Sequence, residues 1–229
     1  MAARHPVFAL TYDLLAPGMD AAGAGEHRRR LLAGLSGRVV EVGAGPGRNF
    51  SWYPPEVRQV VAVEPEPYLR RRALHAAGQS LVSVDVVDGV AEALPVADGW
   101  ADTVVFALVL CSVADPDRAL AEARRVVRPG GALRFYEHVA ADSPGWRRAQ
   151  QIADRVWPRV AGGCHTHRDP VATIRRAGFH VDTLDRFAFP PGRGAGLVST
   201  HVLGSARRDP DGVTGPPGTH ATEAGTQVD

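Results

Sequence analysis

The chain has 229 residues, of which 45% are hydrophobic and 22% charged; this suffices for one sizeable α/β core but not for two. Its formal net charge of +1 gives no overall field that would favour nucleic acid or an anionic membrane as a partner. All 26 basic residues are arginine, which excludes lysine Schiff-base chemistry, pyridoxal chemistry and a phosphate-binding P-loop. The two cysteines, Cys111 and Cys164, are too few for a disulfide framework and favour a reducing compartment.

The beginning of the sequence gives no sign of a targeting segment, because no apolar stretch follows the first residues. The longest apolar stretch, residues 104–111, is far shorter than the roughly 18–20 residues that a membrane-spanning helix needs. We therefore expect a cytoplasmic protein with no membrane partner.

The N-terminal segment is expected to cover the sheet or the ligand. Residues 7–15 mix aromatic and aliphatic side chains and end at Pro17 and Gly18, and residues 26–35 have the leucine spacing of a helix. Ahead of a nucleotide-binding fold, such a segment is either a plain cover for the sheet or a lid over the ligand. We predict a lid within residues 1–36, with Tyr12 as its contact to the substrate.

A glycine-rich stretch, residues 39–47, organises the fold. Its opening Val-Val-Glu-Val is typical of a strand buried in a parallel sheet. Gly43, Gly45 and Gly47 follow at alternate positions and suit a turn with positive φ, on which a ligand lies against bare backbone. The next predicted strand ends in Glu64, about 20 residues after the first glycine, the spacing at which an acidic side chain reaches a bound ribose. These elements predict a nucleoside-binding half of a sheet.

The ligand follows from what this loop lacks. The dinucleotide fingerprint is Gly-x-Gly-x-x-Gly, whereas this loop has Gly-x-Gly-x-Gly with Glu41 two residues ahead of it. An acidic flank suits a positively charged ligand, and S-adenosylmethionine (SAM) carries an ammonium and a sulfonium group and no phosphate. We therefore predict SAM as the cofactor. Two alternatives remain at this point: a glycine turn in some other α/β protein, and a nicotinamide-dependent oxidoreductase, which the missing fingerprint disfavours.

Strands and helices alternate along the rest of the chain. Strands are predicted at residues 60–63, 81–87, 102–110, 132–138, 179–187 and 197–203. Helices are predicted within residues 48–53, 67–77, 115–129, 140–160 and 169–177, with a loop at 88–97. The helix that begins at Asp115 has a capping residue followed by proline, a clear helix start.

Two further features concern the edges of the fold. Ligands in open α/β sheets bind at the carboxyl ends of the strands, so Glu137 and His138 are expected at the same edge as the glycine loop. Residues 205–229 have almost nothing to bury and are predicted to form a disordered tail, which leaves a single domain at residues 1–204.

The segment Cys164-His165-Thr166-His167 has several metal-binding side chains close together. With Glu137 they would satisfy the preferences of zinc, but their tight local spacing matches no standard zinc site, so no metal is predicted. We instead predict that Cys164, His165 and His167 form a wall of the substrate pocket, with a solvent-facing loop as the alternative. Cys111 follows an apolar strand and is interpreted as a buried structural thiol.

Three stretches carry a resemblance to a known family. They are residues 39–53, with Asn-Phe-x-x-Tyr-Pro-Pro after the glycine loop; residues 104–113, with Leu-Cys-Ser-Val; and residues 124–140, with Arg-Arg-Val-Val-Arg-Pro-Gly-Gly and Glu-His-Val-Ala. Gly163 and Cys164 with a following threonine also fit. The chain resembles the class I SAM-dependent methyltransferases, above all the branch of animal methyltransferase-like proteins that methylate thiols and their small bacterial relatives. This resemblance implies one Rossmann-like, doubly wound α/β sheet of seven mostly parallel strands, with helices on both faces and an antiparallel last strand.

The resemblance also implies roles for individual residues. The cofactor-binding residues it implies are Glu41, Gly43, Ala44, Gly45 and Gly47 along the methionine part of SAM, Glu64 on the ribose hydroxyls, Pro65, Ala91 and Glu92 beside the adenine, and Ala107 and Leu108 on the inner side. One departure concerns adenine recognition, because Val90 stands where many relatives have an aspartate. The animal relatives of this branch also carry an N-terminal membrane segment, and no such segment is expected here.

The reaction expected is in-line transfer of the methyl group to a small apolar acceptor in a desolvated pocket, with a thiol favoured. A phenol, a quinone carbon or an amine is the alternative acceptor, and a non-catalytic SAM-binding protein is a further alternative. His138 is the candidate catalytic base for an acceptor that needs one; the alternative is a histidine that only orients the end of its strand. No nucleic-acid partner is expected, because no basic stripe with aromatic stacking positions is present. The sequence does not indicate an oligomeric state.

Overall fold

The computed structural model describes residues 6–190 and 196–209, which share one seven-stranded sheet. The strands are β1 (Gly37–Val42), β2 (Val57–Val63), β3 (Val84–Val87), β4 (Ala101–Ala107), β5 (Val127–His138), β6 (Phe179–Ala188) and β7 (Thr200–Arg208). Their order is β3-β2-β1-β4-β5-β7-β6. Six strands run in one direction, and β7 runs in the opposite direction between β5 and β6. The predicted fold class is confirmed, including the antiparallel last strand.

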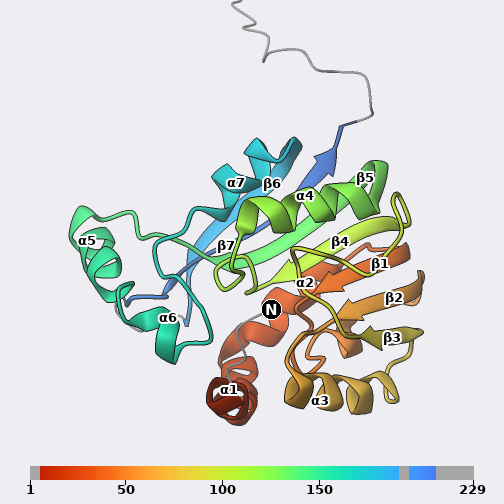
Figure 1. Cartoon of the computed structure of the whole chain (residues 1–229), viewed down its shortest axis with the longest axis horizontal. Coiled ribbons are helices and arrows are strands. Elements are labelled where there is room, and N and C mark those ends of the chain that lie inside the picture. The colour runs from red at the N-terminus through yellow and green to blue at the C-terminus, as the bar shows by residue number, and fades with distance from the viewer. Residues whose placement is uncertain (1–5, 191–195, 210–229) are drawn as a thin grey trace, which may run out of the picture.

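Helices cover both faces of the sheet (Figure 1). They are α1 (Pro6–Met19), the π-helical turn η1 (Asp20–Ala24), α2 (Gly25–Leu32), the short helix η2 (Phe50–Trp52), α3 (Pro67–Ala77), α4 (Pro116–Val126), α5 (Pro144–Ala153), α6 (Trp157–Val160) and α7 (Pro170–Arg176). Helices α4 and α7 pack on one face, and α2 and α3 pack on the other. Helices α5 and α6 project beyond the carboxyl ends of the parallel strands. No helix in the described ranges is long and apolar enough to cross a membrane.

Alternation along β4 explains why the sheet is buried on both sides. Val104 and Phe106 belong to the apolar core beneath α4 and α7, whereas Val105 belongs to the core beneath α2 and α3. Successive side chains of a strand point to opposite faces, so a central parallel strand with both faces covered needs an unbroken apolar run. This is the run that the sequence shows at β4, and its three side chains are fully buried.

Capped helix starts position α4 and α7. The side chain of Asp115 accepts a hydrogen bond from the backbone N–H of Arg118 (3.0 Å), and Asp169 accepts one from Ala172 (3.0 Å). Each cap is followed by proline, whose missing N–H is harmless in the first turn. The predicted helix start at Asp115 is confirmed.

The structure corrects several predicted boundaries. Helix α1 continues through Pro17, because a proline removes only one helical hydrogen bond, and the chain bends later at Gly23 (φ 117°). Strand β3 begins three residues later than predicted, and β4 ends at Ala107 because Leu108 has φ 62°. Strand β7 extends to Arg208 and pairs with both β5 and β6, so the predicted tail cannot begin at residue 205. The remainder of that tail, residues 210–229, lies outside the described residues.

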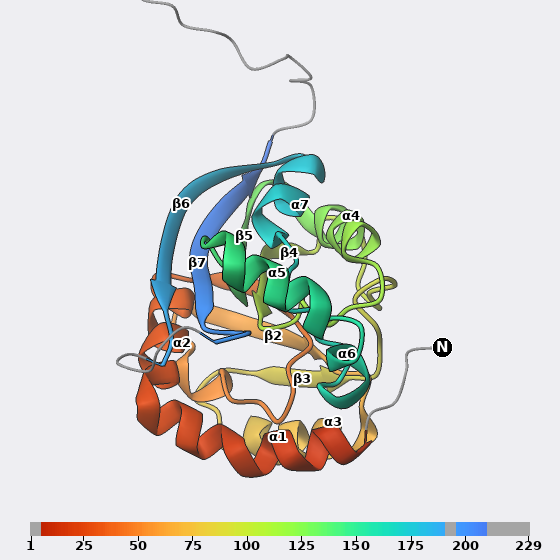
Figure 2. The same ribbon diagram turned by 90° about the vertical axis from the view of Figure 1, so that its left-hand side faces the viewer.

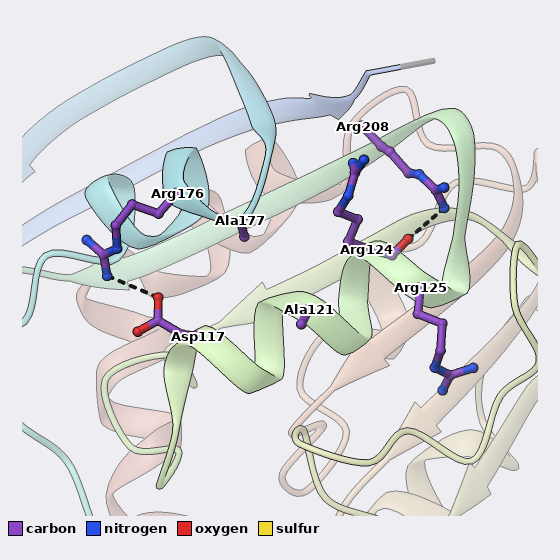
Figure 3. Close-up of a pocket in the computed structure, with 7 residues that line it drawn as sticks. All are labelled: Asp117, Ala121, Arg124, Arg125, Arg176, Ala177 and Arg208. Carbon is purple, nitrogen blue, oxygen red and sulfur yellow. Dashed lines mark hydrogen bonds and ion pairs between the residues drawn. The ribbon is translucent and has the colours of Figure 1, made fainter. Parts of the chain in front are cut away.

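An arginine-rich hollow lies between α4 and α7 (Figure 3). Arg208 donates to the backbone carbonyls of Arg124 and Val127 at 2.7 Å each, and Arg176 pairs with Asp117 at 3.1 Å. These arginines hold the end of β7 and the end of α7 against α4. The residues that line the hollow therefore have a structural role, because they hold β7, α7 and α4 together.

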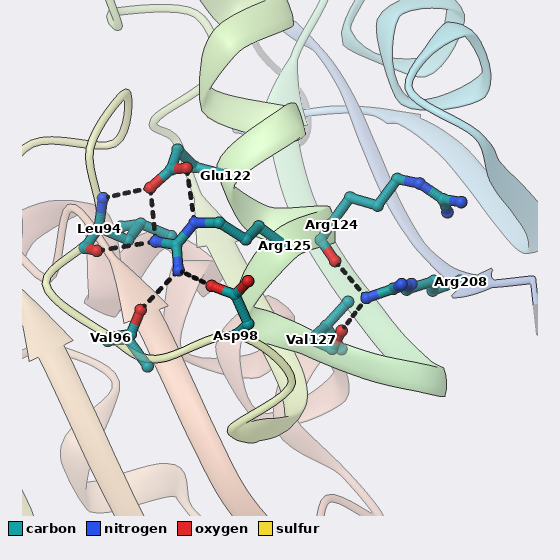
Figure 4. A network of polar contacts seen from close by, with 8 residues as sticks. All are labelled: Leu94, Val96, Asp98, Glu122, Arg124, Arg125, Val127 and Arg208. Carbon is teal, nitrogen blue, oxygen red and sulfur yellow. Dashed lines mark hydrogen bonds and ion pairs between the residues drawn. The ribbon is translucent and has the colours of Figure 1, made fainter. Parts of the chain in front are cut away.

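Another arginine, Arg125, fixes the loop that follows β3 (Figure 4). Arg125 of α4 donates to the backbone carbonyls of Leu94 (3.0 Å) and Val96 (2.8 Å) and pairs with Glu122 (2.7 Å) and Asp98 (2.6 Å). Glu122 also accepts the N–H of Leu94 at 2.8 Å. The part of this loop that follows Ala91 and Glu92, the residues expected beside adenine, is thereby attached to α4.

Candidate functional site

The glycine loop leaves the carboxyl end of β1 with glycine in the left-handed region at three positions. Gly43, Gly45 and Gly47 have φ values of 66°, 57° and 83°. A Cβ atom on Gly43 would lie 2.7 Å from Cγ2 of Val109, and one on Gly47 would lie 2.7 Å from the ring of Phe50. The first of these contacts puts the turn after β4 directly against the glycine loop. Larger residues would be strained in both backbone and packing.

Glu64, at the end of β2, is bonded to this loop. One carboxylate oxygen accepts the N–H of Gly45 at 2.7 Å, and the other accepts the N–H of Glu66 at 2.9 Å. The side chain is 5% exposed, and burial raises the pKa of its carboxyl group. The carboxylate therefore lies where the first two strands end, beside the backbone of the loop.

The carboxylate of Glu41, which is predicted to lie beside the methionine part of SAM, bonds to residues that follow the glycine loop. Its two oxygens accept hydrogen bonds from Asn49 Nδ2 (2.9 Å) and Tyr53 Oη (2.7 Å), and the residue is only 2% exposed. Burial raises the pKa of this carboxyl group to about 7. Arg28 of α2 donates to Asn49 Oδ1 at 2.9 Å from below. These bonds show that Glu41 braces the loop, and its contact with the methionine part of SAM stays a prediction.

The two loop residues expected beside adenine, Ala91 and Glu92, point their side chains in different directions. Ala91 is 7% exposed and faces the core, where it packs with the residues beneath α4. The side chain of Glu92 accepts the N–H of Asp115 at 3.1 Å and so points to the start of α4. The backbone carbonyl of Pro65 accepts a hydrogen bond from Arg70 at 3.1 Å. The backbone carbonyl of Glu92 also accepts a hydrogen bond from Arg118 at 3.0 Å, and a contact of this residue with adenine stays a prediction.

The turn after β4 is held by a buried acid. Leu108 has φ 62°, which is unusual for a residue with a side chain, and its N–H donates to the carbonyl of Tyr136 at 2.7 Å. A single oxygen of Glu137 accepts the N–H groups of Val109 (2.8 Å) and Leu110 (3.0 Å). Glu137 is fully buried, so it belongs to the scaffold of this turn.

Helix α1 lies close to the glycine loop, and its role as a lid stays a prediction. A Cβ atom built on Gly45 would have Cε1 of Tyr12 at 3.9 Å. The ring of Phe8, one turn earlier, lies directly on Gly162, which follows α6. Figure 2 faces the carboxyl ends of the parallel strands and shows α1 along one side of this edge with α5 and α6 across it. Two segments far apart in sequence thus cover the site together.

Cys111, His138 and Cys164 meet at the same edge of the sheet. The two sulfur atoms and a ring nitrogen of His138 all lie within 4.8 Å of one another. Nε2 of His138 is 2.9 Å from Sγ of Cys164. The neighbouring Cys111 thiol, followed by burial, raises the pKa of Cys164 above its ordinary value. The backbone N–H of His165 donates to the carbonyl of Cys111 at 2.8 Å and ties the two segments together.

The other two histidines predicted for the pocket wall have a different partner. Nδ1 of His165 is 2.5 Å from a carboxylate oxygen of Asp154, and Nδ1 of His167 is 3.2 Å from the same oxygen. Of the three residues predicted for this wall, only Cys164 joins His138. Asp154 carried no signal in the sequence, because it is an isolated acid at the end of α5.

An aromatic cluster borders His138 on the side of β7. The ring of His201 lies 6.3 Å from that of His138, 5.5 Å from Tyr136, 6.0 Å from Phe187 and 5.6 Å from Phe189. Burial lowers the pKa of His201 to about 4, so this imidazole is neutral at pH 7. The surroundings of His138 on this side are therefore apolar and uncharged.

Comparisons with known proteins agree with this geometry. The methyltransferase domain family matches residues 40–135. Human thiol S-methyltransferase TMT1A is 38% identical over 181 residues, covering 76% of this chain and 73% of the relative. The chain belongs to the SAM-dependent methyltransferases. Two solved structures show the same fold: a SAM-dependent methyltransferase of Thermotoga maritima, possibly acting on histamine (TM-score 0.67, 23% identity, 88% of this chain and 97% of that one), and geranyl diphosphate methyltransferase in complex with SAM (TM-score 0.63, 14% identity, 82% and 85%).

The residues of this methyltransferase fit SAM as the cofactor. The glycine loop presents bare backbone at three positions, and the ring of Tyr12 lies close to Gly45. The carboxylate of Glu64 lies at that same backbone, where it can exchange N–H partners for hydroxyl groups. Glu64 alone would also suit the ribose of a dinucleotide, but the loop reads Gly-x-Gly-x-Gly and lacks the Gly-x-Gly-x-x-Gly fingerprint, which disfavours dinucleotides.

Sequence reasoning missed the residues that support the methyltransferase's loops. Asn49 and Tyr53 lie within the Asn-Phe-x-x-Tyr motif, so their spacing carried a signal, but their bonds to Glu41 could not be derived from it. Arg168 donates to the carbonyls of Leu110 (2.9 Å) and Val113 (2.7 Å) from a distant segment. No local pattern marks such a long-range contact.

Proposed function

We propose that this methyltransferase transfers the methyl group of SAM to the sulfur of a small apolar thiol. The observation that carries the proposal is the meeting of Cys111, His138 and Cys164 at the edge of the sheet, beside the neutral His201 and its aromatic neighbours. Cys111 lies on the turn that packs against the glycine loop. The 38% identity to human thiol S-methyltransferase TMT1A supports the same acceptor class.

The proposed cofactor contacts follow the strand ends. The ribose hydroxyls bond to Glu64, the methionine part lies along Gly43–Gly47, and the adenine lies beside Pro65 and Ala91. Ala107 and Leu108 cover the inner side, and the left-handed backbone of Leu108 turns the chain away from the cofactor at that point. Tyr12 and Cys164 border the acceptor.

The chemistry requires little from the protein beyond positioning and dryness. SAM supplies an electrophilic methyl group on a positively charged sulfur. When a thiolate approaches it, two opposite charges are neutralised, so removing water from the pair lowers the barrier. The neutral His201 and the rings around it provide such a dry wall. A free thiol with pKa about 8.5 is already a few per cent ionised at pH 7.

His138 remains the candidate base for an acceptor that must lose its proton in the site. Its Nε2 already contacts Cys164 at 2.9 Å, so a substrate proton could reach that nitrogen only after Cys164 moves. This contact favours an acceptor that arrives as a thiolate over a phenol or an amine that depends on a free imidazole.

The test is incubation of the purified protein with labelled SAM and acceptors that share one carbon skeleton but carry a thiol, a hydroxyl or an amine. We expect a methyl thioether from the thiol and at least about 100-fold slower reaction with the other two, because only the thiol is appreciably ionised at neutral pH. Products are identified by mass spectrometry. Methylation of a matched phenol or amine at a rate equal to or above that of the thiol would contradict the proposal.

A further inference from the structure

Cys111, His138 and Cys164 come from three separate segments of the chain. Cys111 lies in the turn after β4, His138 is the last residue of β5, and Cys164 follows α6. Their side chains nevertheless place two sulfur atoms and one imidazole nitrogen within 4.8 Å of one another. Cys111 is 3% and His138 5% exposed, so water solvates neither of them well.

The backbone around this cluster is fixed on several sides. Arg168 donates to the carbonyls on either side of Cys111, those of Leu110 and Val113, and the N–H of His165 donates to the carbonyl of Cys111 itself. His138 continues β5, whose register with β7 pairs it with His201. The three side chains are therefore held together by the fold, independently of any bond among them.

Two thiols and one imidazole are the ligand set that soft transition metals prefer. In a tetrahedral zinc site two sulfur ligands lie about 3.8 Å apart, and sulfur and nitrogen lie about 3.6 Å apart, from bond lengths of about 2.3 and 2.05 Å. The observed limit of 4.8 Å is close to these values, and the 2.9 Å contact between His138 and Cys164 would lengthen by less than an ångström. We propose that Cys111, His138 and Cys164 bind a zinc ion.

Charge and coordination number support an open zinc site. Two thiolates neutralise the ion, so the buried complex carries no net charge with three protein ligands. Among the other histidines nearby, His165 and His167 have Nδ1 atoms that face Asp154, and Nδ1 of His201 lies 3.1 Å from the carbonyl of Ser199. With three protein ligands the zinc keeps a fourth position free, as catalytic zinc sites do and structural sites do not.

The fourth position suits the sulfur of the acceptor, and this part of the inference rests on the proposed function. A thiol that binds zinc loses its proton to solvent and is held as a thiolate. Its sulfur lone pair then forms the bond to the methyl carbon while the bond between that carbon and the SAM sulfur breaks, and the SAM sulfur keeps the electron pair. The neutral thioether and S-adenosylhomocysteine result, and the weakly binding thioether leaves the metal. In this arrangement His138 is a zinc ligand, and zinc performs the activation otherwise assigned to a base.

Zinc binding is tested on the full chain without SAM or acceptor. The protein is reduced, stripped with a chelator and titrated with zinc against a chromogenic competitor, and bound metal is then measured by mass spectrometry. We expect about one zinc ion per chain, and a loss of affinity of more than about 100-fold in Cys111→Ser, Cys164→Ser and His138→Gln. The matched control His167→Gln should bind zinc like the wild type. Absence of zinc from the reduced wild type, or undiminished zinc in the two serine variants, would overturn the site.

Cobalt gives a second measurement that does not depend on the variants folding. Cobalt in the wild type should show thiolate-to-metal charge-transfer absorption, and bound cobalt without this absorption would overturn the ligand set. Adding propanethiol should shift the cobalt spectrum, whereas propanol should not. If propanethiol leaves the spectrum unchanged, the fourth-ligand role is wrong although the metal site stands. Because the zinc titration contains neither SAM nor acceptor, its result is separate from that of the methylation test.

Discussion

Replacing Glu64 by alanine tests the placement of the SAM ribose at the end of β2. The carboxylate is buried and bonds the N–H groups of Gly45 and Glu66 at 2.7 and 2.9 Å. On binding, it is expected to accept the two ribose hydroxyls. The alanine variant loses both of these bonds, while the loop itself keeps its other backbone hydrogen bonds.

The expected magnitude follows from these bonds. A hydrogen bond to a charged group contributes about 1.5–3 kcal/mol, and part of that gain is offset here because the carboxylate gives up N–H partners to accept hydroxyls. The net loss for two bonds is then about 2–4 kcal/mol, or about a 30- to 900-fold rise in the Kd for SAM. Glu64→Gln keeps the shape but loses the charge, so its Kd should lie between those of the wild type and Glu64→Ala.

Calorimetry of SAM binding is the assay, together with thermal unfolding of each variant in the absence of SAM. Asp88→Ala is the matched control, because Asp88 is a carboxylate at the same edge whose side chain is 71% exposed and pairs with Arg70. Its removal should change the Kd by no more than about twofold. If Glu64→Ala folds normally and binds SAM like the wild type, the ribose does not lie at this carboxylate.

Three further predictions concern the scaffold of the site. Gly34→Ala should lower the unfolding free energy by about 1 kcal/mol, because Gly34 has φ 72° but open space around it. Gly43→Ala should lower it by about 1–3 kcal/mol more, because the added Cβ would meet Val109. Similar losses for both variants in denaturant titrations would refute the packing argument. Arg125→Ala should destabilise the fold by about 2 kcal/mol through the loss of its bonds to Leu94 and Val96, and equal hydrogen-exchange protection of this loop in variant and wild type would contradict that role. His201 has a lowered pKa of about 4, so the stability of the fold decreases as pH drops from 6.5 towards 4. Glu41 has a raised pKa of about 7, so the stability decreases as pH rises from 4.5 towards 7. Between pH 5 and 7 the two residues therefore contribute opposite changes of about 2 kcal/mol in unfolding free energy. His201→Gln should therefore lose stability as pH rises relative to the wild type and Glu41→Gln should gain it, and parallel unfolding curves of all three proteins at both pH values would refute these assignments.

The sequence predicted the glycine loop and Glu64 well because their relation is local in the chain. A strand, a turn with glycine and a second strand have nearly fixed lengths, so a spacing of about 20 residues determines where the acidic side chain lies. The alternation of strands and helices likewise indicated an α/β fold, while the seven strands and the antiparallel last strand were implied by the resemblance to the methyltransferases. Boundaries were less accurate: β4 ends where Leu108 adopts a positive φ, and no property of a leucine indicates that conformation.

The acceptor side was harder to predict because its contacts are long-range. Cys111 was interpreted alone as a structural thiol, and its neighbours His138 and Cys164 come from segments that only the folded chain brings together. Cys164 was grouped with the histidines beside it in the sequence, whereas their Nδ1 atoms turn to Asp154. Glu41 shows a further limit, since a motif gives the position of a carboxylate but not the direction in which it points.

The contact between Phe8 and Gly162 joins two segments that cover the site but do not belong to the sheet. Covering the site and holding the methyl donor are therefore tasks of different parts of the chain. The groups expected to hold the methyl donor lie between residues 41 and 108, on the ends of paired strands. Much of the roof comes from α1 and from the segment around α5 and α6, which add no strand to the sheet. We therefore expect substitutions in those two segments to alter which acceptors enter, while the contacts of the donor stay intact. In this way related proteins can differ in substrate range and keep the same chemistry.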